Sequence, residues 1–255
     1  MLLKTKNLMK AFGGLKAINK VDFELPAGEI RGIIGPNGSG KSTFFNLVSG
    51  VYDPDPGSYI EFDGHDITNE PPHKIGALGL SRTFQLLRLY QDMSVINNVM
   101  SGYHTRVKYK FFDAVIGRKK IWDQEKEIKD EMMELLSFVG LADYAELNAS
   151  ELSGGQRRLL VLARAIAMKP KLLMLDEPAA GLSPVNVDNL MKIIMQLKDK
   201  YGLTLIIIEH ILKVVMDTCN TVTVLDHGQK IAEGTPSQVK DCLLYTSDAA
   251  DDSLR

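Results

Sequence analysis

The sequence predicts an α/β fold built on a mixed or parallel sheet core, with an antiparallel β subdomain and an inserted helical subdomain. A short apolar strand runs directly into a glycine-rich loop and a helix over residues 30–48. Two later stretches, residues 172–175 and 203–208, are apolar except for Thr204, which is typical of strands covered on both faces. Strand patterns near the N-terminus and a helix-rich stretch over residues 94–147 indicate the two additional parts.

The composition is that of an ordinary globular chain. The 255 residues are 45% apolar and 24% charged, with a net charge of −2, so nothing indicates nucleic-acid binding driven by bulk charge. No apolar run reaches the roughly 18–20 residues that a membrane span needs, and the N-terminus lacks the apolar centre of a signal peptide. The two cysteines form neither a metal-binding spacing nor a disulfide framework. We therefore expect a cytosolic chain.

The loop after the first core strand matches the phosphate-binding pattern G-x-x-x-x-G-K-[ST]. Glycines let successive backbone N–H groups turn toward an anion, and the following helix adds its positive N-terminal end. We expect Lys41 to reach the β- and γ-phosphates and the Ser42 hydroxyl to ligate Mg²⁺. The alternative is a simple glycine-rich turn. The candidate nucleotide contacts are Gly35, Pro36, Asn37, Gly38, Ser39, Gly40, Lys41, Ser42 and Thr43.

The N-terminal region predicts antiparallel strands. Residues 2–10 and 18–24 form two of them, with a turn over residues 11–14, and residues 59–62 form another. Phe12 either stacks on a purine ring or packs the hairpin, and the local pattern by itself favours packing.

The segment that follows contains one candidate polar ligand and several helices. Residues 79–85 predict a strand that ends at Gln85, which is either an ordinary surface amide or a ligand of Mg²⁺ or the attacking water. Ser94 is a candidate N-cap, and apolar residues recur at helical spacing over residues 120–139. The basic, aromatic stretch over residues 103–120 contacts either a membrane partner or solvent.

The sequence Leu-Ser-Gly-Gly-Gln over residues 152–156 precedes a strongly helical run that ends before Pro170. Ser153 is a candidate N-cap, and the two glycines leave backbone N–H groups open at the helix start. One nucleotide rarely needs two such helix starts from one subunit. We therefore expect this one to serve a nucleotide that another subunit holds.

Acidic and imidazole side chains follow the two apolar strands, at the edge where ligands of parallel sheets bind. Asp176 fits a water-mediated Mg²⁺ ligand and Glu177 a general base for the attacking water, although adjacent acids are often only a strand exit. His210 is a candidate for a hydrogen bond to a γ-phosphate. A helix over residues 184–201 and a hairpin formed by residues 221–226 and 229–233 complete the prediction.

In this order, the motifs resemble those of the ATPase subunits of ABC transporters. GPNGSGKST resembles Walker A, Gln85 the Q-loop, LSGGQ the signature, LLMLDEP Walker B, and His210 the switch histidine. The likeness covers residues 2–240, and it implies the ABC-ATPase form of the P-loop NTPase fold with ATP and Mg²⁺ as cofactors.

The family's arrangement implies a role for each motif. Two ATPase halves meet head to tail, and each ATP lies between one half's Walker A and the other's signature. Nucleotide contacts outside the loop are then Phe12, Ser153, Gly154, Gly155 and Gln156. The catalytic set is Lys41, Gln85, Glu177 and His210, and the Mg²⁺ ligands are Ser42, Gln85 and Asp176. The D-loop departs from the common pattern because Ser183 stands where many ABC ATPases carry Asp and close relatives often carry Asn. Activity is not excluded by this departure, and communication between the two sites is the property that it would alter.

A closer resemblance is to the G-type ATPase of branched-chain amino acid importers, carried by FGGLKAI and SRTFQLLRLYQDMSVINNVM. It implies a second ATPase subunit, identical or different, two membrane permeases, a periplasmic or lipid-anchored binding protein and no nucleic acid. The expected location is the cytoplasmic face of a bacterial or archaeal inner membrane. The alternatives are a soluble ABC ATPase without a transporter, or an ATPase for urea or lipopolysaccharide. Ribosomal types usually fuse two ATPase halves and DNA-repair types insert a long coiled coil, whereas this chain has one of each motif and no sustained heptads.

We expect residues 1–241 to form a single ATPase domain, with its helical subdomain over about residues 86–165. Residues 242–255 resemble instead a translated sequencing adapter, whose bases encode Cys242 to Asp251. The natural chain is then truncated near Lys240, and the tail is not native. Finding these codons in the intact gene, recovered from its source DNA, would contradict this expectation.

Overall fold

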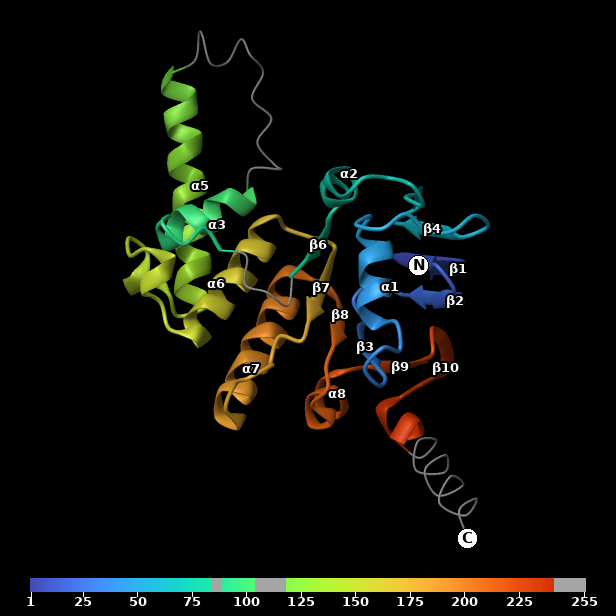
Figure 1. The fold of residues 1–255 in the computed structure, drawn as a ribbon. Helices are drawn as coiled ribbons and strands as arrows, with labels where there is room; N and C mark the ends of the chain where they lie inside the picture. The colour runs from blue at the N-terminus through green and yellow to red at the C-terminus, as the bar shows by residue number, and fades with distance from the viewer. Residues whose placement is uncertain (84–88, 104–117, 241–255) are drawn as a thin grey trace.

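The computed structural model describes residues 1–83, 89–103 and 118–240 (Figure 1). Its centre is a six-stranded sheet in the order β10-β9-β3-β8-β7-β6. The neighbouring pairs from β9 to β6 are parallel, and β10 pairs antiparallel to β9 at the edge. The strands are β3 (Ile30–Ile34), β6 (Leu80–Arg82), β7 (Leu172–Asp176), β8 (Thr204–Ile208), β9 (Thr221–Asp226) and β10 (Gln229–Gly234).

A second sheet of four strands has the order β2-β1-β4-β5, and its pairs are antiparallel. Its strands are β1 (Leu3–Phe12), β2 (Leu15–Leu25), β4 (Tyr59–Phe62) and β5 (His65–Asp66). The sequence placed the β1–β2 turn over four residues, which is too wide. Phe12 pairs with Leu15, and Gly13, with φ of 58°, allows a two-residue turn.

The central strands β7 and β8 are covered on both faces of the sheet, which is why they are buried throughout and mostly apolar without alternation. Along β7, Leu172 and Met174 lie in one buried cluster, together with Phe44 of α1 and Phe62 of the four-stranded sheet. Leu173 and Leu175 lie in the other cluster, with the helices after β6 and β7. Figure 1 shows the four-stranded sheet and α1 on one side of β7 and β8, and α6 and α7 on the other.

The helices are α1 (Lys41–Val48), α2 (Pro72–Ala77), α3 (Val95–Tyr103), α5 (Arg118–Phe138), α6 (Gly154–Ala167), α7 (Pro184–Tyr201) and α8 (Leu212–Thr218), with short 3-10 turns at Ala142–Tyr144 and Ala149–Glu151. The predicted helix over 184–201 is confirmed: proline stands in its first turn, and Gly202 closes it with φ of 62°. The Ser94 hydroxyl accepts the Asn97 N–H at 3.3 Å, as expected of a helix N-cap.

Two predicted boundaries need correction. β6 ends at Arg82 rather than at residue 85, although the next residue, Thr83, still donates its N–H to the Met174 carbonyl at 2.9 Å. The last strand extends to Gly234, one residue beyond the prediction. Gln85 and residues 104–117 lie outside the described part of the chain, as do residues 241–255 with Cys242, so the interpretations placed on them stay predictions.

Candidate nucleotide-binding site

The loop between β3 and α1 has the backbone that its glycines predict. Gly35, Gly38 and Gly40 adopt φ values of 150°, 81° and 103°. A Cβ atom at Gly35 would lie 2.0 Å from the Leu225 carbonyl oxygen, and one at Gly40 would lie 2.4 Å from the carbonyl oxygen of Ala17. Only glycine fits at these two positions, because β9 and β2 approach the loop so closely.

The Lys41 side chain lies against the loop that it follows. Its ammonium donates to the carbonyl oxygens of Gly35 at 2.7 Å and Pro36 at 2.9 Å. Burial lowers the pKa of Lys41, while the nearby carboxylates of Glu177 and Asp176 act in the opposite direction. The structure thus brings the predicted phosphate-binding lysine close to both acids that follow β7.

Asp176 is buried at the end of β7, where it pairs with an arginine that the sequence analysis did not single out. Arg82 Nη2 donates to Asp176 Oδ2 at 2.9 Å, and both side chains are 7% exposed. The same guanidinium donates to Asn46 Oδ1 of α1 at 2.6 Å and lies over the Phe45 ring. The sequence signal was a charged residue within a predicted strand of the sheet, because a buried charge requires a partner, but that signal does not say which residue the partner is.

Glu177 and His210 come from the ends of neighbouring strands, β7 and β8. His210 Nε2 lies 2.8 Å from Glu177 Oε1. The Glu177 backbone has φ of 48°, and its N–H donates to the Ile208 carbonyl at 3.0 Å, which fixes where the side chain leaves the sheet. The structure therefore brings together the predicted general base and the predicted phosphate-sensing histidine.

Glu209, between the apolar strand and His210, is a second residue that the sequence analysis did not single out. It is 3% exposed, and its carboxylate accepts the N–H groups of Ala179 at 2.7 Å and His210 at 3.2 Å. Burial raises the pKa of Glu209. Its contacts fix the backbone that carries His210 against the turn after Glu177.

Comparison with known proteins identifies this site. The profile of the ABC transporter family matches residues 18–180, a range that includes the loop, the helix start after Leu152 and the acids after β7. The chain belongs to the ABC transporter family. It is an ATP-binding domain of that family, whose members bind and hydrolyse nucleotide, and the predicted family and P-loop α/β fold are confirmed.

Relatives of the same length support this assignment. The chain is 36% identical to the high-affinity branched-chain amino acid transport ATP-binding protein BraF of Pseudomonas aeruginosa, over 94% of each chain. It is 41% identical to the probable branched-chain amino acid transport ATP-binding protein LivG of Archaeoglobus fulgidus, over 93% of this chain and 91% of the relative. The crystal structure of a nucleotide-free ATP-binding cassette from an ABC transporter superposes with a TM-score of 0.81 at 34% identity, over 95% and 94% of the two chains.

The ABC signature forms the start of α6. The Ser153 hydroxyl accepts the Gln156 N–H at 3.4 Å, and Gln156 Oε1 accepts the Ser153 N–H at 2.9 Å, so the two residues form a capping box. Side-chain atoms at Gly154 or Gly155 would meet nothing within 4 Å, which leaves this helix start open. In Figure 1, α6 lies on the other side of β7 and β8 from α1. That the start of α6 serves a nucleotide held by another subunit stays a prediction.

Phe12 of this ABC domain shows features both of a residue that packs the hairpin and of one that stacks on a purine ring. Its side chain contacts Tyr52 edge-to-face at 5.4 Å, and Lys10 Nζ lies 5.6 Å from the ring centroid. It is nevertheless 45% exposed, which leaves ring surface for a stacking partner. Adenine stacking by Phe12 stays a prediction.

The donors at the Walker motifs fit a magnesium ion that is shared with phosphates. Mg²⁺ usually keeps several waters and takes one or two protein oxygens plus substrate phosphates. Among the described residues there is no group of three or more His, Cys, Asp or Glu side chains suited to hold a metal, so an all-protein cage is absent there. An exposed hydroxyl at Ser42 and a carboxylate at Asp176, both beside Lys41, are the hard oxygen ligands that this mode requires.

No helix in the described part of this ABC domain combines the length and the apolar content that a bilayer crossing requires.

Proposed function

We propose that this chain is the ATP-hydrolysing subunit of an importer for branched-chain amino acids and acts as one half of an ATPase dimer. The observation that carries the catalytic part is the Glu177–His210 pair, which two neighbouring strands hold beside Lys41. The substrate rests on the names of the relatives, since no residue of an ATPase subunit contacts the transported solute.

Each residue near the loop has a task in hydrolysis. Backbone N–H groups of the loop bind the phosphates. The Lys41 ammonium exchanges its hydrogen bonds to the Gly35 and Pro36 carbonyls for hydrogen bonds to phosphate oxygens. Glu177 takes the proton of the attacking water, and His210 orients Glu177 and the terminal phosphate. Ser42 and Asp176 would hold Mg²⁺, which would supply charge compensation for the phosphates. Gln85 completes the proposed metal set.

The open helix start at Ser153, Gly154 and Gly155 contributes to the partner's site in this proposal. Its N–H groups and positive helix end suit a γ-phosphate that another subunit presents. Closure around two ATP molecules then pulls on two permeases at the membrane, and a periplasmic or lipid-anchored protein delivers the solute. In this proposal the chain lies peripherally on the cytoplasmic face of a bacterial or archaeal inner membrane.

The test is sedimentation of the full chain carrying Glu177→Gln, with ATP and Mg²⁺ and then with ADP. Removing a general base slows hydrolysis by about 100- to 10,000-fold while nucleotide binding remains, so the closed state accumulates. A mass that doubles only with ATP supports a head-to-tail homodimer. A monomer that still binds ATP indicates a different ATPase as partner. Absence of ATP binding contradicts the proposed site. The matched control is Glu146→Gln, the same substitution at an exposed acid that pairs with Lys129.

The substrate has its own test. Any permease and binding-protein genes found beside this one are expressed together with the chain, and uptake of labelled leucine is compared with uptake of labelled urea. Leucine uptake that requires ATP and is lost in Glu177→Gln supports the branched-chain assignment. Urea uptake, or the absence of neighbouring permease genes, favours one of the two alternative ATPase classes.

A further inference from the structure

We propose that the β9–β10 hairpin braces the phosphate-binding loop, with Gly228 in direct contact and a buried Arg31 network holding the hairpin in place. Arg31 and Gly228 are then positioning residues for nucleotide binding. This inference rests on the proposed role of the loop over residues 35–43 as the phosphate site.

The hairpin turn contacts the loop and β2 at the same time. The Gly228 N–H donates to the Ser39 carbonyl at 3.0 Å, and the Gly228 carbonyl accepts the Asn19 N–H at 2.8 Å. Ser39 is only 2% exposed, although it lies in the middle of a loop. The turn therefore contacts the loop through the carbonyl of Ser39 and not through an N–H group, the kind of group expected to bind phosphate.

The approach at this turn is too close for any side chain. Gly228 has φ of 76°, and a Cβ atom there would lie 2.7 Å from the Ala17 carbonyl oxygen and 2.9 Å from the carbonyl oxygen of Lys16. Gly40, the residue after Ser39, faces the same Ala17 carbonyl. The loop, β2 and the hairpin turn thus meet backbone to backbone, and a displacement of one displaces the others.

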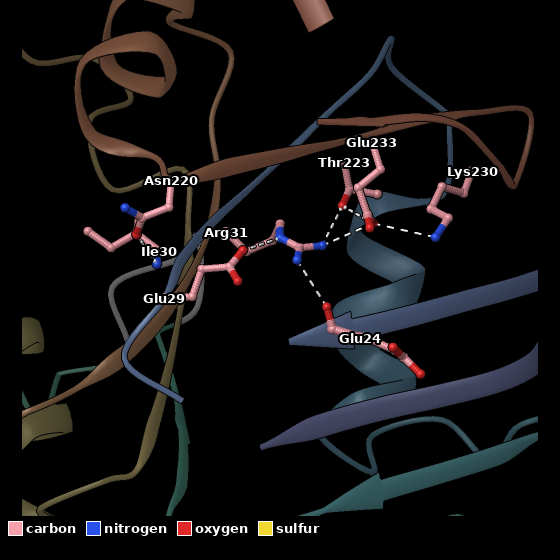
Figure 2. A network of polar contacts seen from close by, with 8 residues as sticks. All are labelled: Glu24, Glu29, Ile30, Arg31, Asn220, Thr223, Lys230 and Glu233. Atoms are coloured by element: carbon pink, nitrogen blue, oxygen red, sulfur yellow. Dashed lines mark hydrogen bonds and ion pairs between the residues drawn. The ribbon is translucent and has the colours of Figure 1, made fainter. Parts of the chain in front are cut away.

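The hairpin is fixed by a cation that four elements share, as Figure 2 shows. Arg31 of β3 is 4% exposed and donates to Glu233 of β10 at 3.0 Å and to Thr223 of β9 at 3.2 Å. It also donates to the Glu24 carbonyl of β2 at 3.0 Å, and to Glu29 at 2.7 Å. Its guanidinium lies over the Phe23 ring.

A buried guanidinium with this many acceptors sets the distance between strands more tightly than the ladder hydrogen bonds of an edge strand. Among the described strands β10 pairs only with β9, and a register shift between Lys230 and Ala232 weakens that pairing. The Glu233 carboxylate, which also accepts from Thr223 and Lys230, ties this edge strand back to β3, the strand that leads into the loop. Loss of the Arg31 network therefore loosens the hairpin, and with it the support beneath Ser39.

The test combines nucleotide affinity with hydrogen exchange on the full chain. Arg31→Met, Glu233→Gln and Gly228→Ala are compared with wild type, and Leu197→Val in α7 serves as a control that perturbs the core without touching the loop. For the arginine and glycine variants we expect ATP to bind about tenfold more weakly, the equivalent of about 1.4 kcal/mol. Exchange of amides over residues 35–41, measured without nucleotide, should rise in all three variants and stay unchanged in Leu197→Val. All measurements are made at a temperature at which every variant is folded.

The outcomes distinguish failure of the proposed support by the hairpin from failure of the proposed nucleotide site. If faster exchange stays confined to residues 225–234 and the affinity is unchanged, the hairpin does not support the loop and the proposal is wrong. If wild type binds no ATP, the proposed function fails, while the exchange data still decide whether the hairpin holds the loop. If Gly228→Ala does not fold, Glu233→Gln decides the question alone, because it keeps the shape of the side chain and removes only its charge.

Discussion

At the residue scale, the site depends on charges that are buried in pairs. Arg82 and Asp176 lie on adjacent strands, both 7% exposed, and the arginine also reaches α1 through Asn46. Removing one partner of such a pair leaves an uncompensated buried charge, which costs more than the pair itself contributes. Asp176 is therefore oriented by a residue that contacts no nucleotide in the proposed mechanism.

We predict that Arg82→Met lowers the free energy of unfolding by about 3–5 kcal/mol, because the Asp176 carboxylate remains buried without its cation. Urea unfolding in the absence of Mg²⁺ measures this. In a double-mutant cycle, Asp176→Asn should cost much less in the Arg82→Met background than in the wild-type protein. Additive losses would show that the two side chains do not depend on each other.

The buried thiol of Cys219 gives a pH-dependent prediction. Burial raises the pKa of Cys219 to about 11, above its ordinary value of 9.0. The unfolded chain therefore ionises first as the pH rises, and stability falls above about pH 9 by up to about 1.4 kcal/mol per pH unit. Unfolding of a Cys242→Ser variant, followed from pH 7 to 10, measures this effect.

The matched comparison is the same variant with Cys219→Ala added. The extra alkaline loss should disappear in it, although the cavity that it leaves lowers stability at every pH. A thiol reagent should also label Cys219 only after unfolding. Rapid labelling of the folded protein at pH 8 would contradict the burial of this side chain.

At the element scale, the helical part is held to the core by a close crossing of α3 and α6. A Cβ atom at Gly102 of α3 would lie 2.2 Å from the Arg164 carbonyl oxygen of α6. The two helices approach at this point without a side chain between them. Asn98, one turn earlier on α3, is fully buried and donates to the carbonyl oxygens of Tyr90, Met93 and Ser94, which fixes the chain before the helix.

We predict that Gly102→Ala destabilises the protein by about 1–3 kcal/mol, since the helices must separate to admit a methyl group. Gly76→Ala in α2 is the matched control, because its Cβ would make an ordinary contact of 3.7 Å with the Met168 methyl carbon. That substitution should be neutral or stabilising by up to about 1 kcal/mol, through helix propensity alone. Equal effects in thermal unfolding would show that the crossing is not as close as described.

The elements show which features a local pattern can predict. The bounds of α7 were predicted correctly because proline and glycine mark its two ends, and the Ser153 cap was predicted because its pattern is local. The partner of Asp176 could not be predicted, since Arg82 lies 94 residues away and no spacing rule relates β6 to β7. The same applies to Gly228, whose contact with Ser39 depends on strand order.

At the scale of the whole molecule, the central sheet joins parts that are distant in sequence. Its two faces contribute to two separate apolar clusters, one shared with the four-stranded sheet and α1, the other with the helices. Neither cluster is complete without the sheet. The layers are therefore expected to unfold together rather than one by one.

We predict that the slowest-exchanging amides lie on β3, β7 and β8, because every opening that exposes them removes both clusters. Phe62→Leu in one layer and Leu190→Ala in the other should each accelerate amide exchange on these strands. The size of each increase should match the loss in the global free energy of unfolding that the substitution causes. Native-state hydrogen exchange with mass spectrometry measures both. Acceleration confined to the substituted layer would indicate independent folding units.

The alternation of side chains along β7 determines which genetic changes this strand can accept. Exchanging one aliphatic residue for another of similar volume keeps each side chain in its own cluster. A one-codon deletion between Leu172 and Leu175 is different, because it reverses the direction of every side chain on one side of the deleted position. Either the apolar residues change layers, or Asp176 turns away from Arg82. We therefore expect this stretch to vary in residue type but not in length.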